Sequence, residues 1–498
     1  MRVRFFWFVG AAIVVALTLT GTAGERRWTL INGRNVTIAG QQSPKALRRI
    51  AVELEQFRAA LGSLVGQAGQ PPPTLVYVFD NHRALEPFVP LSQGRPAALD
   101  GYCHCGAGAD INFIAASLTG YTGASAIIFH EYTHLFLSHA VRSLPVWLNE
   151  GLAEYYSTFR LTDDGRRVVI GSPVEPHVNA VRGRYIPVAD LLAVDQASAL
   201  YDESDRRSVF YAEAWLLTHY LLVERPNGAE AVGRYLHAVA NGRPASQVFL
   251  EAFGLSPSEM DSALRRYRER PTFRSRTYEL PARLGVDEPD RERTMPAAEA
   301  EARLGDVQLR VGRLDEAAVR IEAAAAAGPD VAPAQLTLAL MRLGQNKEAE
   351  AWLPLQKAAA LAPSDFLTQY VLALSLLRKE IGTTTEDPRE LAHAALTRAL
   401  AANPRSTDAL AWQAYVDLEL DTRIPEARAA IARAVELAPD RLDYRLRLAE
   451  VCLRQGERSK ARRLLTELAI ATGDDRAVTR AKVLLAQIDR ESNDQISP

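Results

Sequence analysis

The sequence predicts two folded parts, an α+β domain followed by an all-α solenoid. In the first part, segments with the two-residue period of strands are interleaved with segments of helical period. In the last third the composition changes to Ala, Leu, Arg and Glu, and one pattern returns at intervals of 34, 41 and 35 residues. A chain of 498 residues is also too long for one hydrophobic core.

Composition and the N-terminus indicate an exported protein that does not bind nucleic acid. The 58 basic and 60 acidic residues nearly cancel, so no basic field attracts nucleic acid or an anionic membrane. Arg2 and Arg4 precede an apolar run and then small residues up to Ala23, which is typical of a secretory signal over residues 1–23. We therefore expect a periplasmic or extracellular protein, which would be membrane-anchored if the signal stays uncleaved. No other segment is long and apolar enough to span a membrane.

The elements of the first domain, expected over residues 24–275, follow in order. The segment 28–38 alternates like strands, 44–64 carries a helical apolar stripe, and 74–79 is an apolar run typical of a buried strand. The segment 111–115 is a further short strand. Strands and helices in this order indicate an α+β domain.

The most informative segment of this domain is His130-Glu131-Tyr132-Thr133-His134, which has the pattern H-E-x-x-H. On a helix, positions i and i+4 share a face, so both imidazoles reach one metal ion and Glu131 reaches a water held by that ion. A second amphipathic segment, 146–156, offers Glu150 as the natural third ligand. Three protein ligands leave a fourth position for water, as a catalytic zinc site requires.

These residues carry a resemblance to a known family. The pair HEYTH and Asn149-Glu150-Gly151-Leu152-Ala153-Glu154-Tyr155 resembles the gluzincin metallopeptidases, in particular the peptidase MA-like domains fused to helical repeats. The resemblance implies a zincin-like fold, Zn²⁺ as the cofactor, and the strand 111–115 lying along a cleft where it pairs with extended substrate. An ordinary interior strand is the alternative.

The resemblance also implies a role for each site residue. His130, His134 and Glu150 would be the zinc ligands, and Glu131 the general base. Asn149 and Glu154 would accept the second ring N–H groups of the ligand histidines and so orient them.

After a polar hairpin over 161–170, the helical segment 208–223 places Tyr211 where related gluzincins carry a Tyr that stabilises the oxyanion. The alternative is a Tyr packed in a core helix. His219, on the same helix, is expected to be structural.

Cys103-His104-Cys105 allows three interpretations. It is a second metal site, a disulfide of an exported protein, or a plain loop. The spacing is not that of a zinc knuckle, and no partner pair is visible in the sequence.

The C-terminal part follows a charged, Pro-containing stretch, 276–297, which we expect to be a linker or a final irregular piece of the first domain. Pro329, Pro363, Pro404 and Pro439 each follow an Ala-rich helix end. A period near 34 with two helices resembles the tetratricopeptide repeat, TPR. We expect about five repeats with a capping helix over 298–490, and a tail over 491–498. Small residues at the helix contact are expected at Ala317, Ala349, Ala392, Ala427 and Ala461.

Together these patterns predict an exported zinc-dependent peptidase that cleaves a peptide or protein substrate. Its TPR domain would bind substrate or a protein partner on the concave face, unless the repeats only support the catalytic domain. The alternative is a non-catalytic TPR adaptor or scaffold with a peptidase-like module. A third reading is hydrolysis of a non-peptide substrate at the same metal site.

Overall fold

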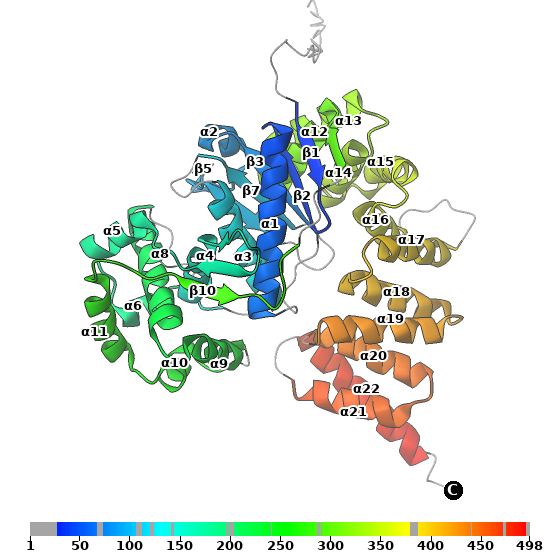
Figure 1. Ribbon diagram of the computed structural model, residues 1–498. Coiled ribbons are helices and arrows are strands. Elements are labelled where there is room, and N and C mark those ends of the chain that lie inside the picture. Colours follow the sequence, from blue (N-terminus) through cyan, green and yellow to red (C-terminus); the bar gives the residue numbers. More distant parts are fainter. Residues whose placement is uncertain are drawn as a thin grey trace, which may run out of the picture.

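The computed structural model describes residues 27–66, 73–105, 112–119, 124–140, 144–195, 198, 204–240, 242–285, 289, 291–378, 387–439, 441–471 and 475–494. Figure 1 shows three parts: a sheet with helices on both faces, a mostly helical lobe beside it, and an arc of paired helices that leads to the C-terminus. The expected signal at 1–23 lies outside the described residues. Of the helices in the described part, none combines the length and apolar character that crossing a membrane requires.

The described residues form a main sheet of six strands in the order β11-β1-β2-β3-β7-β6. Its strands are β1 (Thr29–Asn32), β2 (Val36–Gly40), β3 (Thr74–Phe79), β6 (Gly101–His104), β7 (Asn112–Ser117) and β11 (Arg291–Thr294). The central pairs β2–β3 and β3–β7 are parallel, and the other pairs are antiparallel. The central strands are buried on both faces, which is why β3 appears in the sequence as a continuous apolar run.

Alternating residues of the strands supply two separate cores. Val76 and Val78 pack with α1 (Pro44–Val65) and α3 (Ala124–Ala140) on one face. Tyr77 and Phe79 pack on the other face with α2 (His82–Leu85), η2 (Glu86–Phe88) and α12 (Ala297–Arg310). A short hairpin, β4 (Leu91–Ser92) and β5 (Arg95–Pro96), precedes β6. This α/β/α arrangement confirms an α+β first part, without identifying it as a zincin.

The helical lobe contains α4 (Val146–Ser157), α5 (Glu175–Gly183), α6 (Val188–Leu192), α8 (Ser204–His219), η3 (Tyr220–Glu224), α9 (Gly228–Ala240), α10 (Ala245–Phe253) and α11 (Pro257–Arg268). Gly151 lets α4 and α8 approach closely, because a Cβ atom there would lie 2.4 Å from the Ala214 carbonyl oxygen and 2.1 Å from Thr218 Oγ1. His219, buried in α8, contacts the Tyr267 hydroxyl through Nδ1 and the Gly171 carbonyl through Nε2. Since Nε2 must donate to that carbonyl, Nδ1 accepts from Tyr267, as suits a structural histidine.

A small sheet completes this lobe. Its strands are β8 (Arg160–Leu161) and β9 (Arg167–Ile170), which form the expected hairpin, and β10 (Arg276–Glu279). The segment 276–297 is therefore more than the expected linker. It contains β10, paired with β9, and β11, paired with β1 in the main sheet. These strands are largely exposed and charged, so they lack the apolar alternation by which strands are found in a sequence.

In the described residues, the C-terminal part consists of five helix pairs and a last helix. The first pair is α12 with α13 (Leu314–Ala327), followed by α14 (Ala332–Gly344) with α15 (Glu348–Leu361), α16 (Phe366–Leu377) with α17 (Pro388–Ala402), α18 (Thr407–Leu420) with α19 (Ile424–Leu437), and α20 (Leu442–Arg454) with α21 (Arg458–Ala469). The last helix is α22 (Asp475–Asp494). The expected helical solenoid is thus confirmed (Figure 1). The longest interval of the repeat pattern, the 41 residues from Pro363 to Pro404, contains residues 379–386, which lie outside the described residues.

Candidate metal centre

Three side chains from two helices converge on one point. His130 and His134 lie one turn apart on α3, and α4 brings Glu150 against them. The two Nε2 atoms are 3.0 Å apart, and Glu150 Oε2 is 3.6 Å from that of His130 and 3.4 Å from that of His134. A tetrahedral zinc ion with nitrogen and oxygen ligands at about 2.0–2.2 Å keeps its ligand atoms about 3.3–3.6 Å apart. The set therefore fits one zinc ion.

The electrostatics of the three groups also suit a cation. Burial lowers the pKa of His134, but the Glu150 carboxylate outweighs it and raises the pKa to about 9. Burial raises the pKa of Glu150, yet the two imidazoles more than reverse this effect and hold it well below its usual range. A carboxylate that is only 2% exposed and stays ionised creates a strongly negative point, which favours a positive ion.

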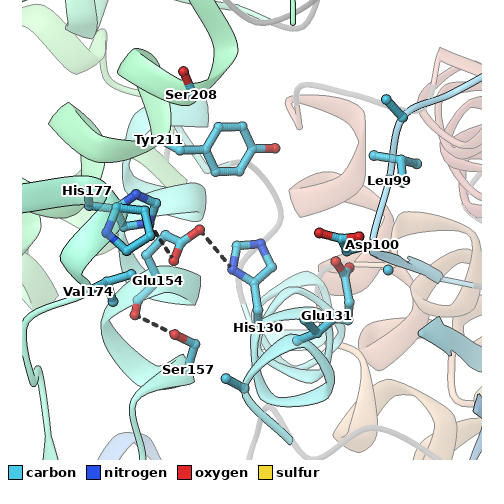
Figure 2. A pocket seen from close by; sticks show the side chains of 15 residues that line it. Leu99, Asp100, His130, Glu131, Glu154, Ser157, Val174, His177, Ser208 and Tyr211 are labelled. Carbon is cyan, nitrogen blue, oxygen red and sulfur yellow. Dashed lines mark hydrogen bonds and ion pairs between the residues drawn. The ribbon is translucent and has the colours of Figure 1, made fainter. Parts of the chain in front are cut away.

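A pocket of about 360 Å³ opens beside this centre. Glu131, Tyr211, Glu154 and Asp100 line it, and its lining contains no Lys or Arg among the described residues. Figure 2 shows the Glu131 carboxylate and the Tyr211 hydroxyl pointing toward the same space, on either side of His130. The Tyr211 ring stacks on His130, with a centroid distance of 6.3 Å. Both residues are therefore within the candidate site rather than in the core behind it.

Glu154 connects the centre to a histidine that the sequence did not single out. Its Oε1 lies 3.4 Å from His130 Nδ1, and its Oε2 lies 2.9 Å from His177 Nε2 (Figure 2). Burial raises the pKa of Glu154, but His177 and His130 together lower it below its ordinary value. Because metal-bound imidazoles usually give their second N–H to a carboxylate, Glu154 is suited to orient His130.

The structure thus brings together all seven residues named from the sequence. Asn149, next to Glu150 on α4, is among the groups that raise the pKa of His134. His177 was missed because it comes from α5, after the hairpin, at no regular spacing from the motif. No signal in a single sequence marks such a residue.

The strand that borders the cleft differs from the expected one. Residues 112–115 of the expected segment lie within β7, whose two edges are paired with β3 and β6. β7 therefore has no edge for extended substrate, and the interior alternative is correct. β6 is the last strand of the sheet in the described part of the chain, and Gly101 and the preceding Asp100 line the pocket.

Comparisons with known proteins match the C-terminal part. A family model described as tetratricopeptide repeat matches residues 421–488. A TPR repeat-containing protein of Pseudomonas aeruginosa strain PAO1 is 29% identical over 170 residues, which are 34% of this chain and 28% of the relative. The chain thus spans little more than a quarter of that relative's length. The C-terminal region thus contains TPR repeats.

Two solved structures are also similar, at low overall scores. PilF of Pseudomonas aeruginosa is 18% identical, with 40% of this chain and 86% of that chain covered and a TM-score of 0.32. YrrB, described as a TPR protein with an unusual peptide-binding site, is 20% identical, with 36% and 90% covered and a TM-score of 0.32. Scores of this size do not establish a shared overall arrangement. The gluzincin resemblance thus depends on the residues of the site, and the comparisons support the adaptor alternative better than the peptidase.

Proposed function

We propose that this chain is a zinc-dependent peptidase of the gluzincin type whose TPR domain captures a protein substrate or partner. The observation that carries the peptidase proposal is the convergence of His130, His134 and Glu150, with ligand atoms 3.0–3.6 Å apart. Chance packing seldom gathers two imidazoles and one buried carboxylate at the spacing of a tetrahedral site.

His130, His134 and Glu150 would hold the zinc ion, and Glu154 and Asn149 would orient the imidazoles. Zinc held by these residues would supply an activated water at neutral pH and would polarise a carbonyl group. The low pKa of Glu150 keeps this ligand ionised at neutral pH, and a bound cation would displace the proton that His134 holds.

The remaining chemistry is that of the protein side chains. Glu131 accepts the proton of the attacking water and later delivers a proton to the leaving amine. Tyr211 donates a hydrogen bond to the carbonyl oxygen as negative charge develops on it. Extended substrate would run along β6, because a free strand edge binds backbone groups without reading the sequence.

The adaptor is the second candidate, and the comparisons favour it. The family model and the curated relative both match as TPR proteins. TPR arrays commonly bind peptides or proteins on their concave face, which needs no catalysis. Under the adaptor hypothesis, the domain that carries the metal centre would be a folded module without catalytic turnover.

A single experiment separates the two candidates. The purified protein is incubated with unfolded casein, with and without a chelator, beside Glu131→Gln. The peptidase proposal expects cleavage that the chelator abolishes, and a Glu131→Gln protein that still binds about one zinc ion but has lost at least about 100-fold in turnover. Capture of casein without cleavage in both proteins would favour the adaptor.

A second variant tests the metal site itself. His130→Ala removes a ligand and should abolish zinc binding, as measured by metal analysis of the purified protein. A full zinc content in this variant would contradict the assigned centre.

A further inference from the structure

Two thiols meet at the border of the candidate site. Cys103 lies in β6, and Cys105 directly follows this strand. Their sulfur atoms are 3.7 Å apart. Cys105 is exposed, and Cys103 is partly buried against the α3 side of the sheet. Residues i and i+2 of a strand share a face, so their side chains are held next to each other by the backbone.

The same alternation argues against a Cys-His-Cys metal site. His104 points to the opposite face of the sheet, where its ring stacks on Phe113 at a centroid distance of 5.1 Å. The three side chains therefore cannot converge on one ion. Two sulfur atoms alone provide half of the ligands that a closed zinc site needs. Of the three interpretations given above, this geometry argues against the metal site, and both thiols are free in this structure.

We propose that Cys103 and Cys105 are a reversible disulfide site that reacts by thiol–disulfide exchange with a protein or small-molecule disulfide. Two residues of extended strand span about 6.8 Å, which is near the upper limit of the Cα separation in disulfides. A bridge can therefore form with little backbone movement. Because bonds at this limit are strained, it is also readily reduced.

The difference in exposure between the two thiols determines which one attacks first. The exposed Cys105 thiolate attacks one sulfur of the partner disulfide, forms a mixed disulfide and expels one partner thiolate, which takes a proton from water. Cys103 then gives its proton to solvent and attacks the Cys105 sulfur, so that the second partner thiolate leaves. In total the two cysteines are oxidised by two electrons and the partner disulfide is reduced to two thiols. A hydrogen bond from Cys103, stronger than the opposing effect of burial, lowers the pKa of Cys105 to about 6, which suits the attacking thiol.

The site lies next to the cleft. Gly101, two residues before Cys103, packs so closely on α3 that a Cβ atom there would lie 2.4 Å from Ile127 Cγ2. A bridge at this end of β6 therefore lies on the strand that borders the metal centre. The exchange chemistry itself does not depend on hydrolysis and is testable without it.

Oxidised glutathione is the probe, with intact-protein mass spectrometry as the readout. The wild type should lose two hydrogen masses and retain no glutathione, with the bridge located by peptide mapping. Cys103→Ser should accumulate one glutathione on Cys105, because nothing resolves the mixed disulfide. Cys105→Ser should react at least about 10-fold more slowly than Cys103→Ser, since the remaining thiol is partly buried.

Cys452 supplies an internal control. This third cysteine is buried in α20, so the double variant Cys103→Ser/Cys105→Ser sets the background reaction rate. A stable glutathione adduct on the wild type would overturn the proposal, as would equal rates for the two single variants. Far-UV circular dichroism checks that each variant is folded.

Discussion

At the scale of single residues, Glu154 is the group that links the candidate ligands to the rest of the lobe. It lies between His130 and His177, and both imidazoles face it within 3.4 Å. We predict that Glu154→Gln weakens zinc binding by about 10- to 100-fold, because a neutral amide orients His130 less firmly than a carboxylate does. The measurement is a competition titration against a chelator of known affinity.

The matched control for this variant is Glu175→Gln. Glu175 begins α5 two residues before His177, but its side chain is exposed. This change should leave zinc affinity within a factor of about two. Equal losses in the two variants would mean that general charge, and not the orientation of His130, sets the affinity.

Glu213 provides a test of pH dependence away from the metal. It is fully buried in α8, and this burial raises its pKa to about 8. In the unfolded chain a Glu has a pKa of about 4.3, so the folded protein holds one more proton between these values. Stability must therefore fall as the pH rises through this window, by up to about 1.4 kcal/mol per pH unit.

Glu213→Gln removes this titration. We predict that the variant is more stable than the wild type at pH 7, and that its free energy of unfolding depends less on pH between 5 and 8. Denaturant unfolding of the metal-free proteins at several pH values measures both effects. Glu230→Gln, an exposed carboxylate at the start of α9, should leave the slope unchanged.

Whether a site residue could be predicted from the sequence depends on how far it lies from the motif along the chain. The histidines of the motif lie within one helical turn, and Glu150 follows on the next helix, so their convergence could be predicted. His177 and Glu213 could not be found in this way. Their roles come from contacts with elements that only the tertiary fold brings near.

At the scale of elements, the predictions succeeded where burial imposes a clear period. The helix expected at 44–64 is α1, and the strand expected at 74–79 is β3 with the same ends. The order of strands in the sheet was not predictable, because no local signal says that β6 pairs outside β7. The strand along the cleft was accordingly predicted at the position of β7, whereas β6 borders the pocket.

One of the five alanines predicted at the helix contacts of the TPR repeats is wrong by two residues. Ala317, Ala392, Ala427 and Ala461 are fully buried, as expected, but Ala349 is exposed. Its place in the second repeat is taken by Ala351, which is 1% exposed. In every repeat the contact alanine is followed four residues later by a buried Ile or Leu, here Leu355, whereas Leu353 is 61% exposed. That spacing alone does not identify the correct alanine, because Leu353 also follows Ala349 by four residues, and only the burial of Leu355 separates the two registers.

This register leads to a matched pair of variants. Ala351→Leu adds a large side chain where α14 and α15 meet and should cost about 1–3 kcal/mol of stability. Ala349→Leu makes the same change on the exposed side and should cost less than about 0.5 kcal/mol, since both residues are good helix formers. Urea unfolding of both variants decides the register. Equal destabilisation would contradict it.

At the scale of the whole molecule, the first repeat is part of the core of the sheet. Ala300, Leu304 and Val307 of α12 are buried against Tyr77 and Phe113. The side chain of Gln308 donates to the Pro87 carbonyl at 3.1 Å, and that of Arg313 to the Glu86 carbonyl at 2.8 Å. Next to this contact, a cavity of about 120 Å³ lies between the sheet and the first helices of three repeats, α12, α14 and α16. The repeats therefore also support the main sheet.

The later repeats remain available for a partner. Trp412 of α18 is 37% exposed and packs edge-on against Tyr415, whose ring lies 4.7 Å below the Arg447 guanidinium of α20. Exposed aromatic and arginine side chains are the residues that most often anchor protein partners. One solenoid can thus serve both roles expected from the sequence, support at its first repeat and binding further along.

This division of the solenoid predicts different effects for two truncations. A chain of residues 27–345 keeps α12, α13 and α14, and should unfold cooperatively and bind zinc like the full chain. A chain of residues 27–295 loses α12 and exposes the face of the sheet that bears Tyr77 and Phe113. Because removing even one buried Leu costs about 2–5 kcal/mol, the shorter chain should be unfolded or less stable by more than about 3 kcal/mol. Thermal unfolding and zinc titration of both chains test this, and a fully stable 27–295 would show that the lobe folds independently of the repeats.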